Sequence, residues 1–348
     1  MKRTAWLDYI KLIAMTLVVV YHTPPRYDNA HEAALFNMGA PVFFFAAGYL
    51  FNIARQKGFL DFLRRRARQL LVPYTSFFVI FYALWLVVGR RMAGPDEQAI
   101  DILAPLWQFV QGTPDVVLGP FWFIAALFTM QVIYYPVRKY LSGHWPLVLA
   151  LLLSLSLLVM PDLPWFRYWN LDKAFLYMPI YAFGNCCRPL VDRFDFGSAG
   201  RSLLWVVLAF LGLGFLIVAP LTIDRAVAYV LAPEAVILVL PLYTAVCKGL
   251  ESCFGTSRIA QNVAITGITY LALQNYLIGV IKIIASRLLG PDVLDDSVLL
   301  KVAIALVVMV LLYPLALFVE RYLPFLLGKR CRKAAKYNQQ KNKHIGNL

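Results

Sequence analysis

Residues 6–22 read WLDYIKLIAMTLVVVYH. A helix needs about 20 mostly apolar residues to cross the hydrocarbon core of a bilayer, and this run is close to that length. It follows the basic pair Lys2 and Arg3, and it ends in a histidine, His22. The stretch therefore predicts a membrane-spanning helix that carries polar side chains among apolar ones.

Nine further segments are similar to this one in length and apolar character. The ten predicted spans are 6–22, 34–53, 69–88, 120–137, 145–160, 173–187, 202–219, 227–246, 263–284 and 299–319. Hydrophobic residues make up 61% of the 348 residues and charged residues only 15%, whereas a soluble domain carries about 25% charged residues. We therefore predict an all-α, polytopic integral membrane protein.

The charges predict how the chain is oriented. With the N-terminus in the cytoplasm, most of the 33 Lys and Arg residues fall on the cytoplasmic side, as the positive-inside rule requires. This rule accounts for the net charge of +14 without a nucleic-acid partner. We expect both termini in the cytoplasm, a transmembrane domain over residues 1–328, and a basic tail over 329–348 that is disordered or lies against anionic lipid headgroups.

Three polar residues of the first segment are predicted to share one helix face. Lys11 and His22 are eleven residues apart, which is about three turns and about 16 Å along the axis. Asp8 precedes Lys11 by three residues, so the two side chains can pair. Imidazole exchanges a proton near neutral pH, so His22 is a candidate catalytic base. The alternative is a helix-end histidine bonded to a carbonyl, with an Asp–Lys pair at the membrane interface.

A run of arginines lies between the second and third predicted spans. It consists of Arg64, Arg65, Arg66 and Arg68. Guanidinium groups bind phosphate with two parallel hydrogen bonds, so the run is suited to the phosphates of a donor such as coenzyme A. The alternative is a topology anchor that binds lipid headgroups.

Four other residues are candidates for a cavity within the membrane, namely Asn37, Trp122, Glu234 and Gln274. No cluster of three or four metal ligands is predicted, so we expect no metal. The chain has no phosphate-binding loop, dinucleotide fingerprint, zinc-protease motif or nucleophile elbow. These absences argue against an ATPase, a dinucleotide enzyme, a zinc protease and an α/β-hydrolase.

Four stretches together resemble the membrane-bound acyltransferase 3 family, especially its branch related to fucose 4-O-acetylases. They are Trp6–His22 with ten residues between Lys11 and His22, the run PVFFFAAGYL from Pro41, the pair Arg65 and Arg68 followed by Pro73-Tyr74, and PFWF from Pro120. Two positions depart from the family pattern. Ala47 stands where a serine is usual, and Gln274 stands where a histidine often follows the tyrosine.

The resemblance implies transfer of an acyl group, most often acetyl, from cytoplasmic acyl-CoA to a hydroxyl of a cell-surface or lipid-linked glycan. It implies that Arg65 and Arg68 hold the coenzyme A phosphates, that Asp8 and Lys11 orient the first helix, and that His22 is the general base or a transient acyl carrier. The expected location is the bacterial inner membrane. The alternatives are a secondary transporter or flippase of a lipid-linked saccharide, which also needs a polar stripe in a membrane cavity, and an accessory subunit.

Overall fold

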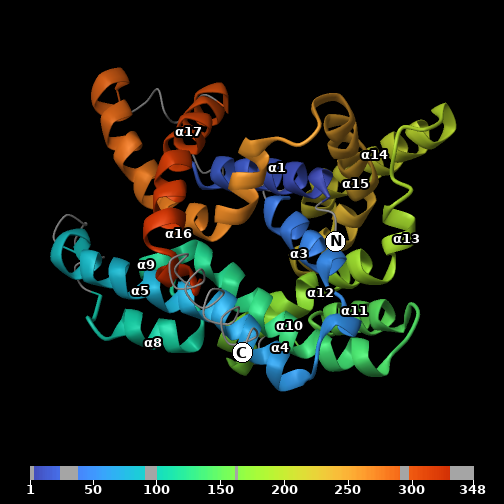
Figure 1. Ribbon diagram of the computed structural model, residues 1–348, viewed down its shortest axis with the longest axis horizontal. Coiled ribbons are helices and arrows are strands. Elements are labelled where there is room, and N and C mark those ends of the chain that lie inside the picture. The colour runs from blue at the N-terminus through green and yellow to red at the C-terminus, as the bar shows by residue number, and fades with distance from the viewer. Residues whose placement is uncertain (1–3, 24–37, 91–99, 161–163, 291–297, 330–348) are drawn as a thin grey trace, which may run out of the picture.

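The computed structural model describes residues 4–23, 38–90, 100–160, 164–290 and 298–329, and these residues form helices and no strand (Figure 1). The main helices are α1 (Ala5–His22), α3 (Gly39–Leu50), α4 (Phe59–Arg66), α5 (Val72–Leu84), α8 (Ala104–Gln111), α10 (Trp122–Tyr140), α11 (Trp145–Ser156), α12 (Leu171–Cys186), α14 (Ala199–Thr222), α15 (Arg225–Phe254), α16 (Arg258–Leu289) and α17 (Val298–Tyr322). Short helical elements lie between them: η1 (Ile53–Arg55), η2 (Ala67–Leu71), η3 (Trp85–Gly89), α9 (Asp115–Leu118), η4 (Gly119–Phe121), η5 (Pro164–Asn170), α13 (Arg188–Val191) and η7 (Pro324–Leu327).

The prediction of a multi-pass, all-helical membrane protein is confirmed. Within the described residues, 7 helices are long and apolar enough to cross a membrane. The other three predicted spans correspond to the shorter helices α3, α11 and α12, of 12, 12 and 16 residues. The count of ten crossings and the cytoplasmic placement of both termini stay predictions, and the tail from residue 330 lies outside the described residues.

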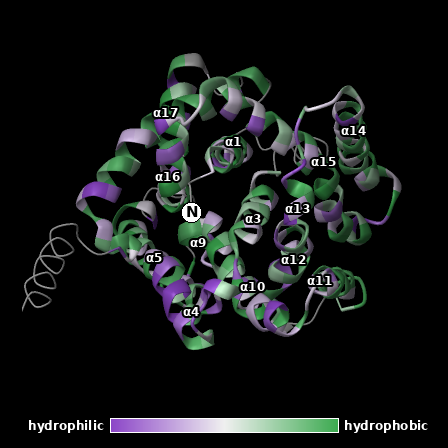
Figure 2. Ribbon diagram, turned by 45° about the vertical axis from the view of Figure 1, so that its right-hand side comes forward, coloured by the Kyte–Doolittle hydropathy of each residue, from purple (hydrophilic) through white to green (hydrophobic). Residues whose placement is uncertain are grey.

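The third span begins earlier than its apolar stretch. The sequence predicts a loop before residue 69, but one continuous helix runs from Phe59 to Gly89 through α4, η2, α5 and η3. Arginine is a good helix former, and Arg65 pairs with Asp61 one turn away, at 3.1 Å. The arginine run therefore lies on this helix, with three arginines in α4 and Arg68 in η2, and α4 is strongly hydrophilic (Figure 2).

Helix α1 lies in the middle of the bundle (Figure 1), in contact with α3, α15, α16 and α17. Two buried apolar clusters meet on it: Trp6 and Ile10 belong to the first, and Met15 and Val19 to the second. The polar residues of α1 therefore lie within protein rather than against lipid, as a charged residue in a membrane span requires.

Helices α3 and α12 are packed so closely that glycines are required between them. A Cβ at Gly48 would collide with the backbone carbonyl of Tyr181, and one at Gly184 would lie 2.5 Å from the carbonyl oxygen of Phe45. Asn185 fixes the end of α3 by donating hydrogen bonds to the carbonyl oxygens of Gly48 (3.2 Å) and Phe51 (2.8 Å). Small residues allow such close approach of helices in membranes, which explains the glycine in the PVFFFAAGYL run.

A carboxylate from α15 caps the start of α1. The backbone N–H groups of Ala5 and Trp6 each donate to one carboxylate oxygen of Glu251, at 3.2 Å. These N–H groups have no partner within the helix, and the negative charge also complements the helix dipole. The contact fixes the helix that carries His22 against α15.

Removal of this cap should destabilise the protein. We expect Glu251→Ala to lower the free energy of unfolding by about 0.5–2 kcal/mol, the usual effect of a lost N-cap, and to lower the melting temperature in detergent. Glu320→Ala is the control, because its pair with Lys329 is partly exposed and such pairs contribute about 0.2–1 kcal/mol. An equal or smaller loss for the Glu251 variant would contradict the capping role.

Candidate functional site

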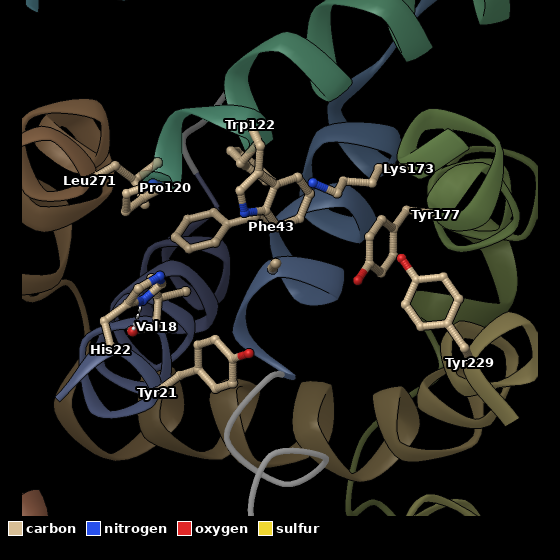
Figure 3. Close-up of a pocket in the computed structure, with 12 residues that line it drawn as sticks. Val18, Tyr21, His22, Phe43, Pro120, Trp122, Lys173, Tyr177, Tyr229 and Leu271 are labelled. Atoms are coloured by element: carbon tan, nitrogen blue, oxygen red, sulfur yellow. Dashed lines mark hydrogen bonds between the residues drawn. The ribbon is translucent and has the colours of Figure 1, made fainter. Parts of the chain in front are cut away.

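A cavity of about 200 Å³ lies where α1 ends and where α3, α10, α12 and α15 begin. Its lining residues are Val18, Tyr21, His22, Ala40, Phe43, Pro120, Trp122, Phe123, Lys173, Tyr177, Tyr229 and Leu271. Aromatic rings make up much of the wall (Figure 3). The lining includes residues from the first two turns of α3, α10, α12 and α15, and helix N-termini carry partial positive charge.

His22 is the last residue of α1, and it lines this cavity. Its Nδ1 lies 2.7 Å from the carbonyl oxygen of Val18, one turn earlier (Figure 3). A carbonyl oxygen only accepts hydrogen bonds, so Nδ1 carries the proton. The lone pair of the neutral ring is then on Nε2, and the hydrogen bond holds the ring orientation. His22 is therefore both a helix-end histidine bonded to a carbonyl and a cavity residue able to accept a proton.

Trp122 is the second predicted residue that lines the cavity. It is the first residue of α10, and its ring stacks with the ring of Tyr177 of α12, with the ring centroids 6.1 Å apart. The ammonium group of Lys173 lies over the same ring, 4.6 Å from its centroid. A cation over an indole face is an attractive contact, so Trp122 orders both neighbours.

The remaining predicted residues of α1 lie toward its other end. Asp8 is buried and Lys11 is half-buried. Neither lines the cavity, so the cavity takes only the His22 end of the predicted polar stripe. Their predicted role is to orient α1, and this role stays a prediction.

The arginine run lies beyond the end of α3 that is away from the cavity. The start of α3 lines the cavity with His22, and α4 follows the other end of α3. Arg64, Arg65 and Arg68 are exposed and Arg66 is half-buried. Arg65 bonds Asp61 and Gln56, while Arg66 lies over the Phe62 ring. The Nε–H of Arg68 donates to the Gly328 carbonyl oxygen at 2.7 Å.

Of the other three candidates, Gln274 and Glu234 do not line the cavity, and their polar side-chain atoms are buried elsewhere. The amide of Gln274 is fully buried, and neither its nitrogen nor its oxygen has a partner in the described part of the chain. Both carboxylate oxygens of Glu234 are likewise buried without a hydrogen bond there. Asn37 lies outside the described residues. Sequence analysis missed Lys173, Tyr177 and Tyr229, because no local pattern distinguishes them from other residues near a helix start.

Comparison with known families shows which family the chain belongs to. A family model described as an acyltransferase domain, that of the acyltransferase 3 family, matches residues 4–321. The chain belongs to the acyltransferase 3 family. No curated protein and no solved structure that we compared with it matches.

The protein is therefore a membrane acyltransferase, and the transporter and accessory-subunit alternatives are set aside. The family match spans the helix that carries His22, the arginine run and every described residue of the cavity lining. The acyltransferase thus has a cavity that contains a histidine able to accept a proton, at the meeting point of five helix ends.

Proposed function

We propose that this acyltransferase moves an acyl group, most often acetyl, from a cytoplasmic acyl-CoA to a hydroxyl of a cell-surface or lipid-linked glycan. The observation that carries the proposal is the placement of His22, whose Nδ1–H is bound to Val18 and whose ring lines an aromatic cavity. Tyr and Trp side chains present a flat apolar face beside a polar group, which suits the mixed apolar and hydroxyl surface of a sugar. We also propose that the protein belongs to the branch of the family related to fucose 4-O-acetylases.

In the proposed reaction His22 acts as the general base. Nε2 takes the proton of the sugar hydroxyl, the sugar oxygen forms a bond to the thioester carbonyl carbon, and the carbon–sulfur bond breaks. The protonated ring then returns its proton to the leaving thiolate, so that free coenzyme A and the ester are the products. In the variant mechanism, Nε2 attacks the thioester carbonyl carbon and the carbon–sulfur bond breaks, which releases the coenzyme A thiolate. The sugar oxygen then takes the acyl group from Nε2, and the hydroxyl proton goes to the thiolate.

The donor is proposed to bind at the arginine run. Arg65 and Arg68, with Arg64 and Arg66 beside them, are proposed to bind its phosphates, since their exposed guanidinium groups are accessible to a charged ligand. The bond of Arg68 to Gly328 uses only Nε. Lys11 lies eleven residues, or about 16 Å, from His22 along α1. For transfer at His22, the acyl end of the donor must therefore extend beyond the middle of α1.

Loss of either paired arginine should weaken donor binding. We expect Arg65→Met and Arg68→Met each to raise the KM for acetyl-CoA by about tenfold or more, because each removes charge-assisted hydrogen bonds to phosphate. The measurement is acetyl transfer at varied acetyl-CoA with the purified protein in nanodiscs. Arg201→Met is the control, because Arg201 is an exposed arginine paired with Asp195. An unchanged KM in both arginine variants would contradict the proposed donor site.

The acceptor and the location are part of the same proposal. We propose that the protein resides in the bacterial inner membrane, with the cavity open to the outer face, where a glycan or lipid-linked saccharide binds. The test in cells is mass analysis of surface glycans with and without this protein. Loss of an acetyl-sized mass from the glycans of the deletion strain is the expected result, and identical glycans would contradict the proposal.

A further inference from the structure

Lys173 is a cation in the cavity, and the described residues offer it no hydrogen-bond acceptor. It is half-buried, it lines the cavity, and its ammonium group lies over the Trp122 ring, 4.6 Å from the ring centroid. An ammonium group has three N–H donors. None of them has a hydrogen-bond or ion-pair partner at the described positions of the chain.

The position itself is unfavourable for a positive charge. Lys173 is the third residue of α12, and a helix N-terminus repels cations. The carboxylates whose charges act on it are Asp172 and Asp115, and neither forms an ion pair with it in the described segments. One oxygen of Asp172 is itself buried without a partner. The protein therefore holds a lysine where burial and the helix dipole both oppose its charge.

The rest of the cavity wall is rich in donors and contains no carboxylate among the described residues. Three of these donors make no hydrogen bond to the described residues, namely the hydroxyl groups of Tyr177 and Tyr229 and the indole N–H of Trp122. The starts of α3, α12 and α15 also contribute to the lining, and helix N-termini carry partial positive charge. A cavity with this charge distribution favours an anion.

We infer that Lys173 binds an anionic group of the acceptor, so that this acyltransferase acts on a saccharide carrying a carboxylate or a phosphate. His22 and Lys173 lie on opposite sides of the cavity (Figure 3). A sugar whose anionic group binds Lys173 therefore places its other side, with its hydroxyl groups, toward His22. Lys173 is a specificity-determining residue in this arrangement, and this role rests on the proposed function.

The test measures acceptor binding without any acyl donor, by calorimetry on the purified protein in nanodiscs. The three probes are methyl glucoside, which is neutral, methyl glucuronide, which carries a carboxylate, and glucose 1-phosphate. We expect the unmodified protein to bind one or both anionic probes about 10- to 100-fold more tightly than the neutral one, the usual effect of a hydrogen bond to a charged group. A preference for the glucuronide identifies an acidic sugar, and a preference for the phosphate identifies a phosphate-linked one.

Lys173→Met should remove this preference, because methionine keeps the apolar stem but has no charge. Lys173→Arg should retain it, and Lys282→Met is the control at an exposed lysine of α16. Equal binding of all three probes by the unmodified protein, no binding of any, or a preference that survives in Lys173→Met would each overturn the inference. Because no acyl-CoA is present, an anion preference in a protein that transfers no acetyl group would refute the proposed function alone.

Discussion

His22→Ala is expected to lower the rate of acetyl transfer by about 100- to 10,000-fold, the range that general acid–base catalysis supplies. The variant removes the ring whose Nδ1–H is bound to Val18 and whose Nε2 is the proposed proton acceptor. The main measurement is ester formation from acetyl-CoA and acceptor by protein in nanodiscs. Binding of acetyl-CoA should change little, because the proposed donor site lies on α4.

The control for His22 is His144→Ala. His144 is exposed and precedes α11, and it does not line the cavity. We expect this variant to retain full activity and the His22 variant to reach the membrane at a normal level with an unchanged melting temperature. Full acetyl transfer by His22→Ala would refute the mechanism.

One further measurement separates the two roles of His22. With radiolabelled acetyl-CoA and no acceptor, an acyl carrier accumulates label on the protein in the first turnover, whereas a general base does not. Label that appears on the unmodified protein and is lost in His22→Ala would identify the carrier mechanism.

Gly48→Ala is expected to give the largest loss of stability, with the free energy of unfolding lowered by about 1–3 kcal/mol or more, because extra atoms in a packed interior force the helices apart. The added Cβ would meet the backbone of Tyr181 rather than a flexible side chain. Asn185 binds the carbonyl oxygens of Gly48 and Phe51, so the shift would disturb those bonds as well. Thermal unfolding in detergent measures the effect.

Gly214→Ala is the matched control for this substitution. Gly214 lies within α14, and a Cβ added there meets nothing within 4 Å. Alanine is the better helix former by about 0.5–1 kcal/mol, so this variant should be as stable as the unmodified protein or slightly more stable. Similar melting temperatures for the two alanine variants would show that α3 and α12 tolerate a wider separation.

Several features of the candidate site could be predicted from local sequence. Lys11 and His22 lie on one helix whose length and direction follow from an apolar run, so His22 could be placed at the end of a span. The arginine run could be identified from the sequence, but its helical conformation could not be predicted. Because its residues are charged, the apolar pattern began only after it, whereas the helix that continues to Gly89 begins before it. The carbonyl partner of His22 was one of two open alternatives, and the structure combines it with a place in the cavity.

A helical membrane protein with a histidine at the end of its first helix could be predicted from the sequence, because apolar length and charge are properties of each segment alone. Which side chains share the cavity with that histidine depends on the tertiary structure. Trp122, Lys173 and Tyr229 come from three different helix starts, and the tight contact at Gly48 joins α3 to α12. These contacts depend on the packing of helices distant in sequence, which no local pattern of residues encodes.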